Sequence, residues 1–477
     1  MSDPSARPRR RWLAGLLWSV AVVIAVLAPA YWFVVAPTFR AFPAAAFPAP
    51  ANQAEAYSQD LSYLRQLPDI DPSFSQEEHA AFDNAIDDLT ARADQLSRAG
   101  FEMGIAAAVA LAGNGHTNAI GAARGVGVNS VPLRFGWFAE GLFVVKASPV
   151  HAGLVGARVV AIEGRDPSEL RKELGGFIGG RAEFGIPMTL NLLASPEALH
   201  AVGLAGSANA LTLDAVSTQG DRIEATVPAT DEPIATYGPD YYPQRELSPQ
   251  PLPKAEGEWV HVLDGKPFPF YLDNPDRGFQ HHFPEPDVLH LQLREVRSRD
   301  GADLGAYLET VLAEVAERKA RHAVVDLRLS GGGDYTQIIG FSAKLPEALA
   351  ADGKLIILSG NRTFSAAISL LARLKAFAGD RAIILGEGPG DHESFWAEGG
   401  RAVLPNSGRI IRYSTVHHDW ENGCRLSQLG TCYFLNYLFG VAAGKLSPPN
   451  PTTLSFADYV DGHDPLLASA LSIIGEK

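Results

Sequence analysis

Cysteine is scarce in this chain, with two among 477 residues, Cys424 and Cys432. Two cysteines without a Cys/His cluster of ligand spacing make a poor zinc site. Three adjacent residues, His417, His418 and Asp419, rarely converge on one ion. The sequence therefore predicts no metal and no cofactor. The two cysteines flank a glycine-containing loop, which in an exported protein predicts a local disulfide. Two reduced, buried thiols are the alternative.

A surplus of positive charge is also missing. Lysine and arginine number 40 against 54 aspartates and glutamates, so the formal net charge is -14. No basic stripe compensates for this balance, which argues against a nucleic-acid partner. The same balance weakly disfavours acidic substrates. No internal repeat is evident.

Charged side chains are absent from Trp12 to Pro37, a stretch long enough to cross a bilayer as a helix. Four arginines directly precede it: Arg7, Arg9, Arg10 and Arg11. Positive charge on this flank predicts a cytoplasmic N-terminus (1–11), one transmembrane anchor (12–37) and an exported remainder. We therefore expect a single-pass protein of the inner membrane with a periplasmic main domain. The alternative is a cleaved signal peptide, because Ala28-Pro29-Ala30 resembles a cleavage site.

The segment after the anchor predicts a tether followed by helices. Residues 38–54 are rich in alanine and proline, which is typical of a tether. Residues 55–112 predict a small helical domain, in which Ser75 and Glu78 have the spacing of a capping box. Four apolar residues recur there close to helical spacing: Phe82, Ile86, Leu89 and Leu96.

The middle of the chain predicts a β subdomain. Residues 113–228 contain several alternating segments that predict strands, with helical patches between them. Gly153 to Glu169 partly resembles a PDZ module, because a short strand precedes a turn at Glu163-Gly164. A proline-rich linker (229–257) follows and predicts a domain boundary.

The last segment, 258–477, predicts an α/β core with several parallel strands. Strand and helix patterns alternate from Val288 onward. One helical pattern begins after Asp303, which we expect to be its N-cap.

Ser365 is the candidate nucleophile of this core. It follows a buried strand at the point where a helix begins, in KLIILSGNRTFSAA (Lys354 to Ala367). A serine there is held rigidly, and the backbone N–H groups behind it face a developing negative charge. A second strand nearby ends in three glycines, whose backbone can approach a ligand closely. We expect N–H groups of Gly331 or Gly332 and of Ala366 to form an oxyanion hole.

These motifs together resemble the S41 serine peptidases. The order is DLR-x-x-GGG from Asp326, then a strand, TFSAA, a further strand and Gly386-Glu387. The resemblance extends from about Gly113 to the C-terminus and is densest from Val288 to Thr415. It implies a ClpP/crotonase-like core and hydrolysis of a peptide or protein substrate.

The general base distinguishes two branches of that family. The tail-specific proteases use a lysine in a GE-x-x-x-GK pattern, and that position here is His392. The chain has no lysine between Lys375 and Lys445. The chain is closer to the tricorn-core and retinoid-binding-like branch, which takes a histidine from its N-terminal part. Asn114-Gly115-His116-Thr117 matches that motif, so His116 is the expected base, with His392 as the alternative.

A carboxylate should orient the base. The tricorn-like branch supplies a glutamate downstream of the serine, and the similar segment Trp420-Glu421-Asn422-Gly423 makes Glu421 the candidate. Two further readings compete with an S41-like peptidase. One is a non-catalytic protein of this fold that binds a peptide or an apolar ligand. The other is an interaction scaffold with an open peptide groove near Gly153.

Overall fold

The computed structural model describes residues 18–19, 28, 31–230, 243–251, 257–299 and 301–475. The predicted cytoplasmic segment (1–11) and most of the predicted anchor (12–37) lie outside these residues, as do 231–242 and 252–256 of the predicted linker. Within the described ranges, no helix is both long and apolar enough to span a bilayer.

The C-terminal half contains a five-stranded sheet in the order β12-β11-β10-β9-β8. Its strands are β8 (Phe279–Glu285), β9 (Val288–Leu293), β10 (His322–Asp326), β11 (Leu355–Ser359) and β12 (Ala382–Gly386). The strands β9 to β12 run parallel, and β8 is antiparallel to β9. All residues of β9, β10 and β11 are buried, as expected for parallel strands covered on both faces. The predicted α/β core is confirmed.

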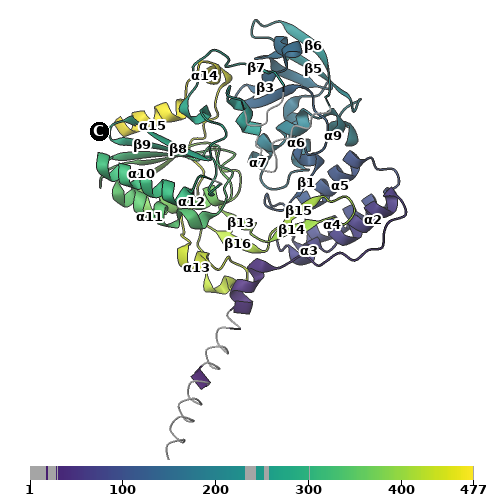
Figure 1. Ribbon diagram of the computed structural model, residues 1–477, viewed down its shortest axis with the longest axis horizontal. Helices are drawn as coiled ribbons and strands as arrows, with labels where there is room; N and C mark the ends of the chain where they lie inside the picture. Colours follow the sequence, from purple (N-terminus) through teal and green to yellow (C-terminus); the bar gives the residue numbers. More distant parts are fainter. Residues whose placement is uncertain are drawn as a thin grey trace, which may run out of the picture.

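Helices cover both faces of this sheet (Figure 1). They are α10 (Leu304–Arg318), α11 (Ile339–Ala348), α12 (Ala366–Ala378) and α15 (Pro465–Gly475). The first three share one hydrophobic cluster with the sheet, and Ala470 of α15 packs in another against Val324 and Ile356. Asp303 caps α10 as predicted, since its carboxylate accepts from the Ala306 N–H at 2.7 Å.

The N-terminal half begins with four helices, α2 (Gln53–Leu64), α3 (Leu67–Ile70), α4 (Gln76–Ala91) and α5 (Arg98–Ala110). The capping box of Ser75 and Glu78 is present at the start of α4. The apolar run predicted over about five turns is interrupted, because α4 ends at Ala91 and Ser97 caps a new helix.

An antiparallel sheet with four short helices follows, as the alternating segments predict. Its strands have the order β2-β3-β4-β5-β6, and β7 pairs with β3. The strands are β2 (Leu133–Phe138), β3 (Gly141–Ala147), β4 (Arg158–Ile162), β5 (Ala210–Val216), β6 (Arg222–Pro228) and β7 (Val260–His261). The helices are α6 (Pro167–Gly175), α7 (Ala182–Met188), α8 (Leu190–Leu193) and α9 (Pro196–Ala201).

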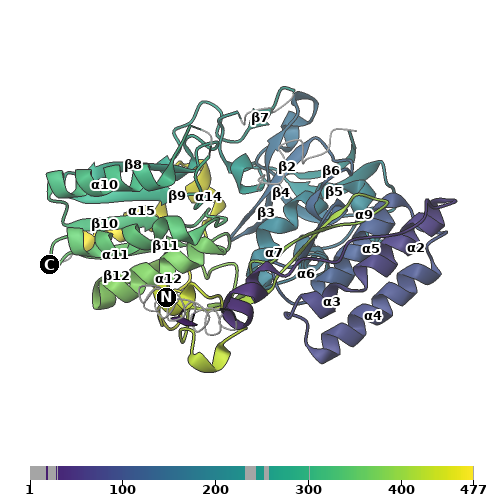
Figure 2. The same ribbon diagram turned by 60° about the horizontal axis from the view of Figure 1, so that its bottom comes forward.

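Strands distant in sequence join the two halves of the molecule, at the labels β1, β14 and β15 in Figure 1, and Figure 2 shows the yellow-green segment running along the blue and purple half. The strand β1 (Asn118–Ile120) pairs antiparallel with β15 (Ile410–Tyr413), which pairs with β14 (Gly400–Val403). Residues of β14 and β15 share one hydrophobic cluster with the N-terminal helices and the antiparallel sheet. The β1–β15 pairing therefore fixes the loop of His116 to the C-terminal half.

The remaining elements lie near the C-terminus. They are β13 (Ser394–Ala397), β16 (Val416–Asp419), α13 (Asn436–Phe439) and α14 (Phe456–Val460). The strands β13 and β16 pair antiparallel. The predicted disulfide joins Cys424 and Cys432, with 6.1 Å between their Cα atoms.

Candidate active site

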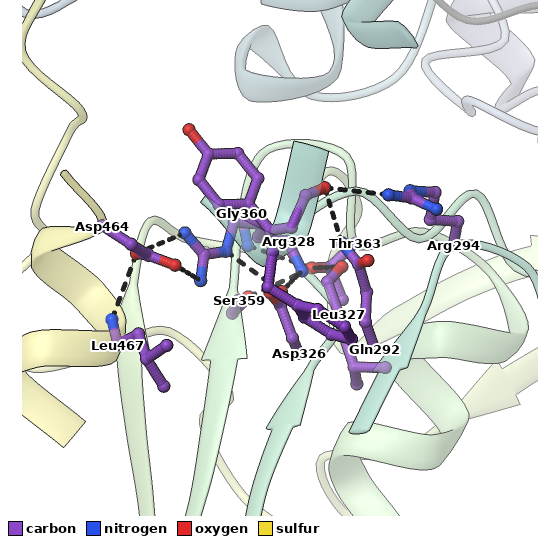
Figure 3. Close-up of polar contacts among 12 residues, drawn as sticks. Gln292, Arg294, Asp326, Leu327, Arg328, Ser359, Gly360, Thr363, Asp464 and Leu467 are labelled. Atoms are coloured by element: carbon purple, nitrogen blue, oxygen red, sulfur yellow. Dashed lines mark hydrogen bonds and ion pairs between the residues drawn. The ribbon is translucent and has the colours of Figure 1, made fainter. Parts of the chain in front are cut away.

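Ser365 lies where the sheet passes into helix α12. A buried hydroxyl fixes the turn before it: Thr363 Oγ1 donates to the Leu327 carbonyl at 2.8 Å and accepts from the Gly360 N–H at 3.0 Å. Figure 3 shows this link between the ends of β10 and β11. The Phe364 N–H also donates to the Ser330 carbonyl at 3.0 Å. The turn that presents Ser365 is thus bonded to the neighbouring strand end on two sides.

The backbone of Ser365 is strained. Its φ of 56° and ψ of -125° are values that a residue with a side chain rarely adopts. Such conformations cost roughly 1–3 kcal/mol and persist where the surroundings enforce them, which is common at functional sites. The Ser365 side chain makes no capping hydrogen bond to α12. The hydroxyl is therefore not used to satisfy the helix.

The glycines after β10 pack directly against the nucleophile. A Cβ on Gly332 would lie 2.5 Å from the Phe364 carbonyl oxygen, 2.7 Å from Ser365 Cβ and 2.9 Å from the Ala366 nitrogen. The Gly331 N–H donates to the Arg294 carbonyl at 3.0 Å, so it is occupied. Within the described part of the chain, the Gly332 and Ala366 N–H groups have no such acceptor. Of the expected oxyanion donors, these two are placed to act together.

The DLR motif holds the same strand end, with Arg328 lying between Asp326 and Asp464 (Figure 3). Arg328 donates from Nε to Asp326 Oδ1 at 3.0 Å and from its two terminal nitrogens to Asp464 at 2.8 and 2.9 Å. Burial alone would raise the pKa of Asp326, but Arg328 and His290 lower it to about 2. This ion-pair network holds the chain that leads into the glycines, so the motif has a structural role.

His116 is fixed by a buried polar network. Asn114 Nδ2 donates to Ser414 Oγ at 2.9 Å, and Thr117 Oγ1 donates to Asp71 Oδ2 at 2.5 Å. Asp71 also accepts from the Ser414 N–H at 2.8 Å. Burial raises the pKa of Asp71, and these hydrogen bonds oppose that shift. The loop of His116 is thus tied to the N-terminal helices and to the end of β15.

The His116 ring stacks between two aromatic rings and contacts one carboxylate. The centroids of Phe364 and Phe395 lie 4.3 and 5.0 Å from that of His116. Its Nδ1 lies 3.4 Å from Oδ2 of Asp391, whose side chain is 4% exposed. His116 and Ser365 line one cavity of about 400 Å³, named here the Ser365 cavity. In the described structure neither ring nitrogen of His116 has a hydrogen-bond partner.

A second histidine–carboxylate pair lies close to Ser365. It lines a cavity of about 150 Å³, with Ser365, Glu398 and His418 among its walls. His418 Nε2 lies 3.3 Å from Glu398 Oε1. Burial would raise the pKa of Glu398, but the contact with His418 lowers it. Glu398 lines both cavities and is 37% exposed, so a carboxylate remains available beside Ser365.

The other predicted residues lie outside these cavities. Glu421 forms an ion pair with the exposed Lys445 at 2.9 Å. His392 is exposed, and its N–H donates to Asp391 Oδ1 at 2.8 Å. Among the residues with described positions, no group of three histidine, cysteine or acidic side chains could hold a metal ion.

Sequence reasoning missed Asp391 and Glu398 as the carboxylates of this site. Asp391 stands directly before His392 in GEGPGDHES, the loop after β12, so its position next to the examined histidine was the available signal. Glu398 gave no comparable signal, because it stands outside every motif singled out in the sequence; it lies in the short connection between β13 and β14, with a φ of 58°.

Several solved structures are similar to this chain. Mature CPAF in complex with lactacystin aligns at a TM-score of 0.55 and 12% identity, covering 88% of this chain and 98% of CPAF. The photosystem II D1 C-terminal processing protease gives a TM-score of 0.37 at 11% identity, covering 90% and 98%. A protein assigned to the S41 proteases, from Bacteroides fragilis, gives 0.31 at 12% identity, covering 72% and 82%.

No family model and no curated protein matches the chain. The likeness to mature CPAF, at a TM-score of 0.55 and 12% identity, shows the fold alone. The S41 resemblance and its branch stay predictions.

Proposed function

We propose that this chain is an S41-like serine peptidase that hydrolyses peptide bonds through an acyl-enzyme on Ser365. One observation carries the proposal. Ser365 has a strained backbone at the start of α12, with Gly332 packed against the Ala366 nitrogen. It shares its cavity with His116, a residue from the opposite half of the molecule. Backbone strain, two N–H donors and a histidine at one serine suit acyl transfer.

The first half of the reaction forms the acyl-enzyme. Ser365 Oγ attacks the carbonyl carbon of the scissile bond, and its proton passes to His116. The electron pair of the C=O bond moves onto the oxygen, which the N–H groups of Gly332 and Ala366 stabilise. One such donor is typically worth about 3 kcal/mol of barrier. Collapse of this intermediate breaks the C–N bond, and His116 gives the proton to the leaving amine.

Water completes the cycle by the same steps. His116 takes a proton from water, which attacks the acyl carbon, and the proton returns to Ser365 as the carboxylic acid leaves. Asp391 is the proposed partner of the protonated His116, because its carboxylate lies 3.4 Å from Nδ1. Hydrogen bonds between catalytic groups are often long in ligand-free structures and shorten when substrate binds.

Labelling with a fluorophosphonate probe tests this assignment. The parent should label, and Ser365→Ala and His116→Ala should not. Ser168→Ala, at an exposed serine of α6 outside both cavities, is the serine control and should label like the parent. Labelling that survives His116→Ala but is lost in His418→Ala would move the base to the second histidine.

The orienting acid is tested separately. Asp391→Asn should slow labelling by one to two orders of magnitude near neutral pH, because an amide cannot stabilise the imidazolium as a carboxylate does. Glu421→Gln is the comparison, since Glu421 was the expectation from the sequence. A slow Glu421→Gln and an unchanged Asp391→Asn would restore Glu421.

A non-catalytic binding protein is the second candidate. It is favoured by the two buried His116 nitrogens, which have no hydrogen-bond partner among the described residues. A folded parent that never labels, although it binds peptide, would establish this alternative.

The proposal includes an extracytoplasmic location. The Cys424–Cys432 disulfide supports it, since such bonds persist in oxidising compartments. The single-pass anchor over 12–37 remains part of the proposal. Alkylation of both cysteines in intact cells without prior reduction would refute the location.

A further inference from the structure

The Ser365 cavity carries a charge opposite to that of the whole protein. Five arginines and one carboxylate, that of Glu398, line it, and Arg297 Nε lies 3.8 Å from Oε2 of Glu295, which is outside the lining. The arginines come from separate parts of the chain: Arg124, Arg297, Arg362, Arg401 and Arg412. The formal net charge of the chain is -14. A concentration of cations in one cavity of an acidic protein therefore needs an explanation beyond composition.

Two of these arginines stand directly opposite each other on neighbouring strands. Arg401 of β14 pairs with Arg412 of β15, and Arg412 pairs on its other side with Asn118 of β1. All three line the cavity. Like charges in directly opposed positions destabilise a sheet.

Two further arginines are positioned by one aromatic ring. The guanidinium carbons of Arg124 and Arg362 lie 5.5 and 5.9 Å from the centroid of Phe184. Phe184 stacks on Phe364, the residue before the nucleophile, at 4.4 Å between centroids. Arg362 is itself 3% exposed and three residues before Ser365. Packing against Phe184 therefore positions the guanidinium groups of Arg124 and Arg362 in the cavity of Ser365.

We propose that the Ser365 cavity selects peptides that carry a carboxylate close to the scissile bond. The guanidinium group can donate two parallel hydrogen bonds to a carboxylate, and such charge-assisted bonds are stronger than those between neutral groups. The inference rests on the proposed function, because it names the substrate class of that site. It also reverses the expectation that an acidic protein disfavours acidic substrates, since the local field of the cavity governs binding.

Peptide capture tests the selection without requiring turnover. The full chain with Ser365→Ala is immobilised and incubated with a randomised decapeptide library, acetylated and amidated at its ends. Retained peptides are identified by mass spectrometry and should be enriched in aspartate and glutamate. Replacing glutamate by glutamine in the best binder should weaken binding about tenfold to hundredfold, the usual range for a hydrogen bond to a charged group.

The arginines are tested in the same background. Arg401→Gln and Arg412→Gln should abolish the difference between the glutamate and glutamine peptides. Arg222→Gln on β6 is the matched control, because Arg222 is exposed and outside the cavity. Arg401 is also exposed, so its single variant should fold as the parent does. Circular dichroism checks this.

A third arm separates two sources of the carboxylate. Neutral peptides with a free C-terminus are compared with the same peptides as amides. Stronger retention of the free acids alone would assign the arginines to a chain terminus and not to an acidic side chain.

The outcomes distinguish this inference from the proposed function. No enrichment of carboxylates, or an enrichment that Arg401→Gln and Arg412→Gln leave unchanged, overturns the inference even if the parent labels at Ser365. Enrichment that these variants abolish supports it. If the parent then fails to label, peptide hydrolysis is refuted and the recognition of acidic peptides stands.

Discussion

Replacing Ser365 by glycine should make the folded protein more stable than replacing it by alanine, the reverse of the usual order. The reason is the backbone of Ser365, whose φ is 56° and ψ is -125°. Alanine retains the Cβ that makes this conformation unfavourable, and glycine does not. Both variants lack the hydroxyl, so the comparison isolates the backbone from the chemistry.

The magnitude follows from two opposing terms. A residue with a side chain in such a region costs roughly 1–3 kcal/mol. Glycine loses roughly 0.5–1 kcal/mol relative to alanine because its unfolded chain is more flexible. We therefore expect Ser365→Gly to exceed Ser365→Ala by about 1 kcal/mol in free energy of unfolding.

Urea unfolding followed by circular dichroism measures the difference. The matched pair is Ser369→Gly and Ser369→Ala, because Ser369 is a buried residue within α12. There glycine should be less stable by about 1 kcal/mol, as in any helix interior. A Ser365→Gly variant that is no more stable than Ser365→Ala would refute the strain.

Three further outcomes are expected. Gly332→Ala should abolish fluorophosphonate labelling, since its Cβ would lie 2.5 Å from a carbonyl oxygen, whereas Gly153→Ala, with no atom within 4 Å, should label normally. The pKa of Asp326 is lowered from 3.8 to about 2 in the folded state, so its carboxylate contributes stability above pH 3.8 that is lost as the pH falls through about 2. Asp326→Asn should therefore weaken the dependence of the free energy of unfolding on pH between pH 3.8 and about pH 2. Acid unfolding curves measure this dependence, and a variant with the same pH dependence as the parent would contradict the prediction. Reduction of the Cys424–Cys432 bond, which spans 8 positions, should cost roughly 2.5 kcal/mol in urea unfolding on the loop-entropy model, and no change would contradict that model here.

The α/β core could be predicted because its signals are local. The strand β11 begins with four successive apolar residues, Leu355 to Leu358, and Asp303 precedes an amphipathic helix, so each element is specified by its own residues. Ser365 could be put forward as the candidate nucleophile for the same reason, since the change from a buried strand to a helix is visible in a dozen residues.

The carboxylates of the site could not be found in this way. Asp391 and His116 lie far apart in the sequence, and their contact forms only when the two halves of the molecule pack together. The branch resemblance directed attention to Glu421, whose side chain instead pairs with Lys445. Which loop approaches a histidine depends on tertiary packing, and no local pattern records it.

The buried contact between Asn114 and Ser414 joins residues 300 positions apart, so the site cannot be complete while the chain is being made. At about 5–20 residues per second, a ribosome needs on the order of 15–60 s to reach Ser414 after Asn114 has been added. During that time the loop of His116 is not held beside Ser365 and its glycines. The proposed hydrolytic activity therefore requires nearly the whole protein to have been synthesised.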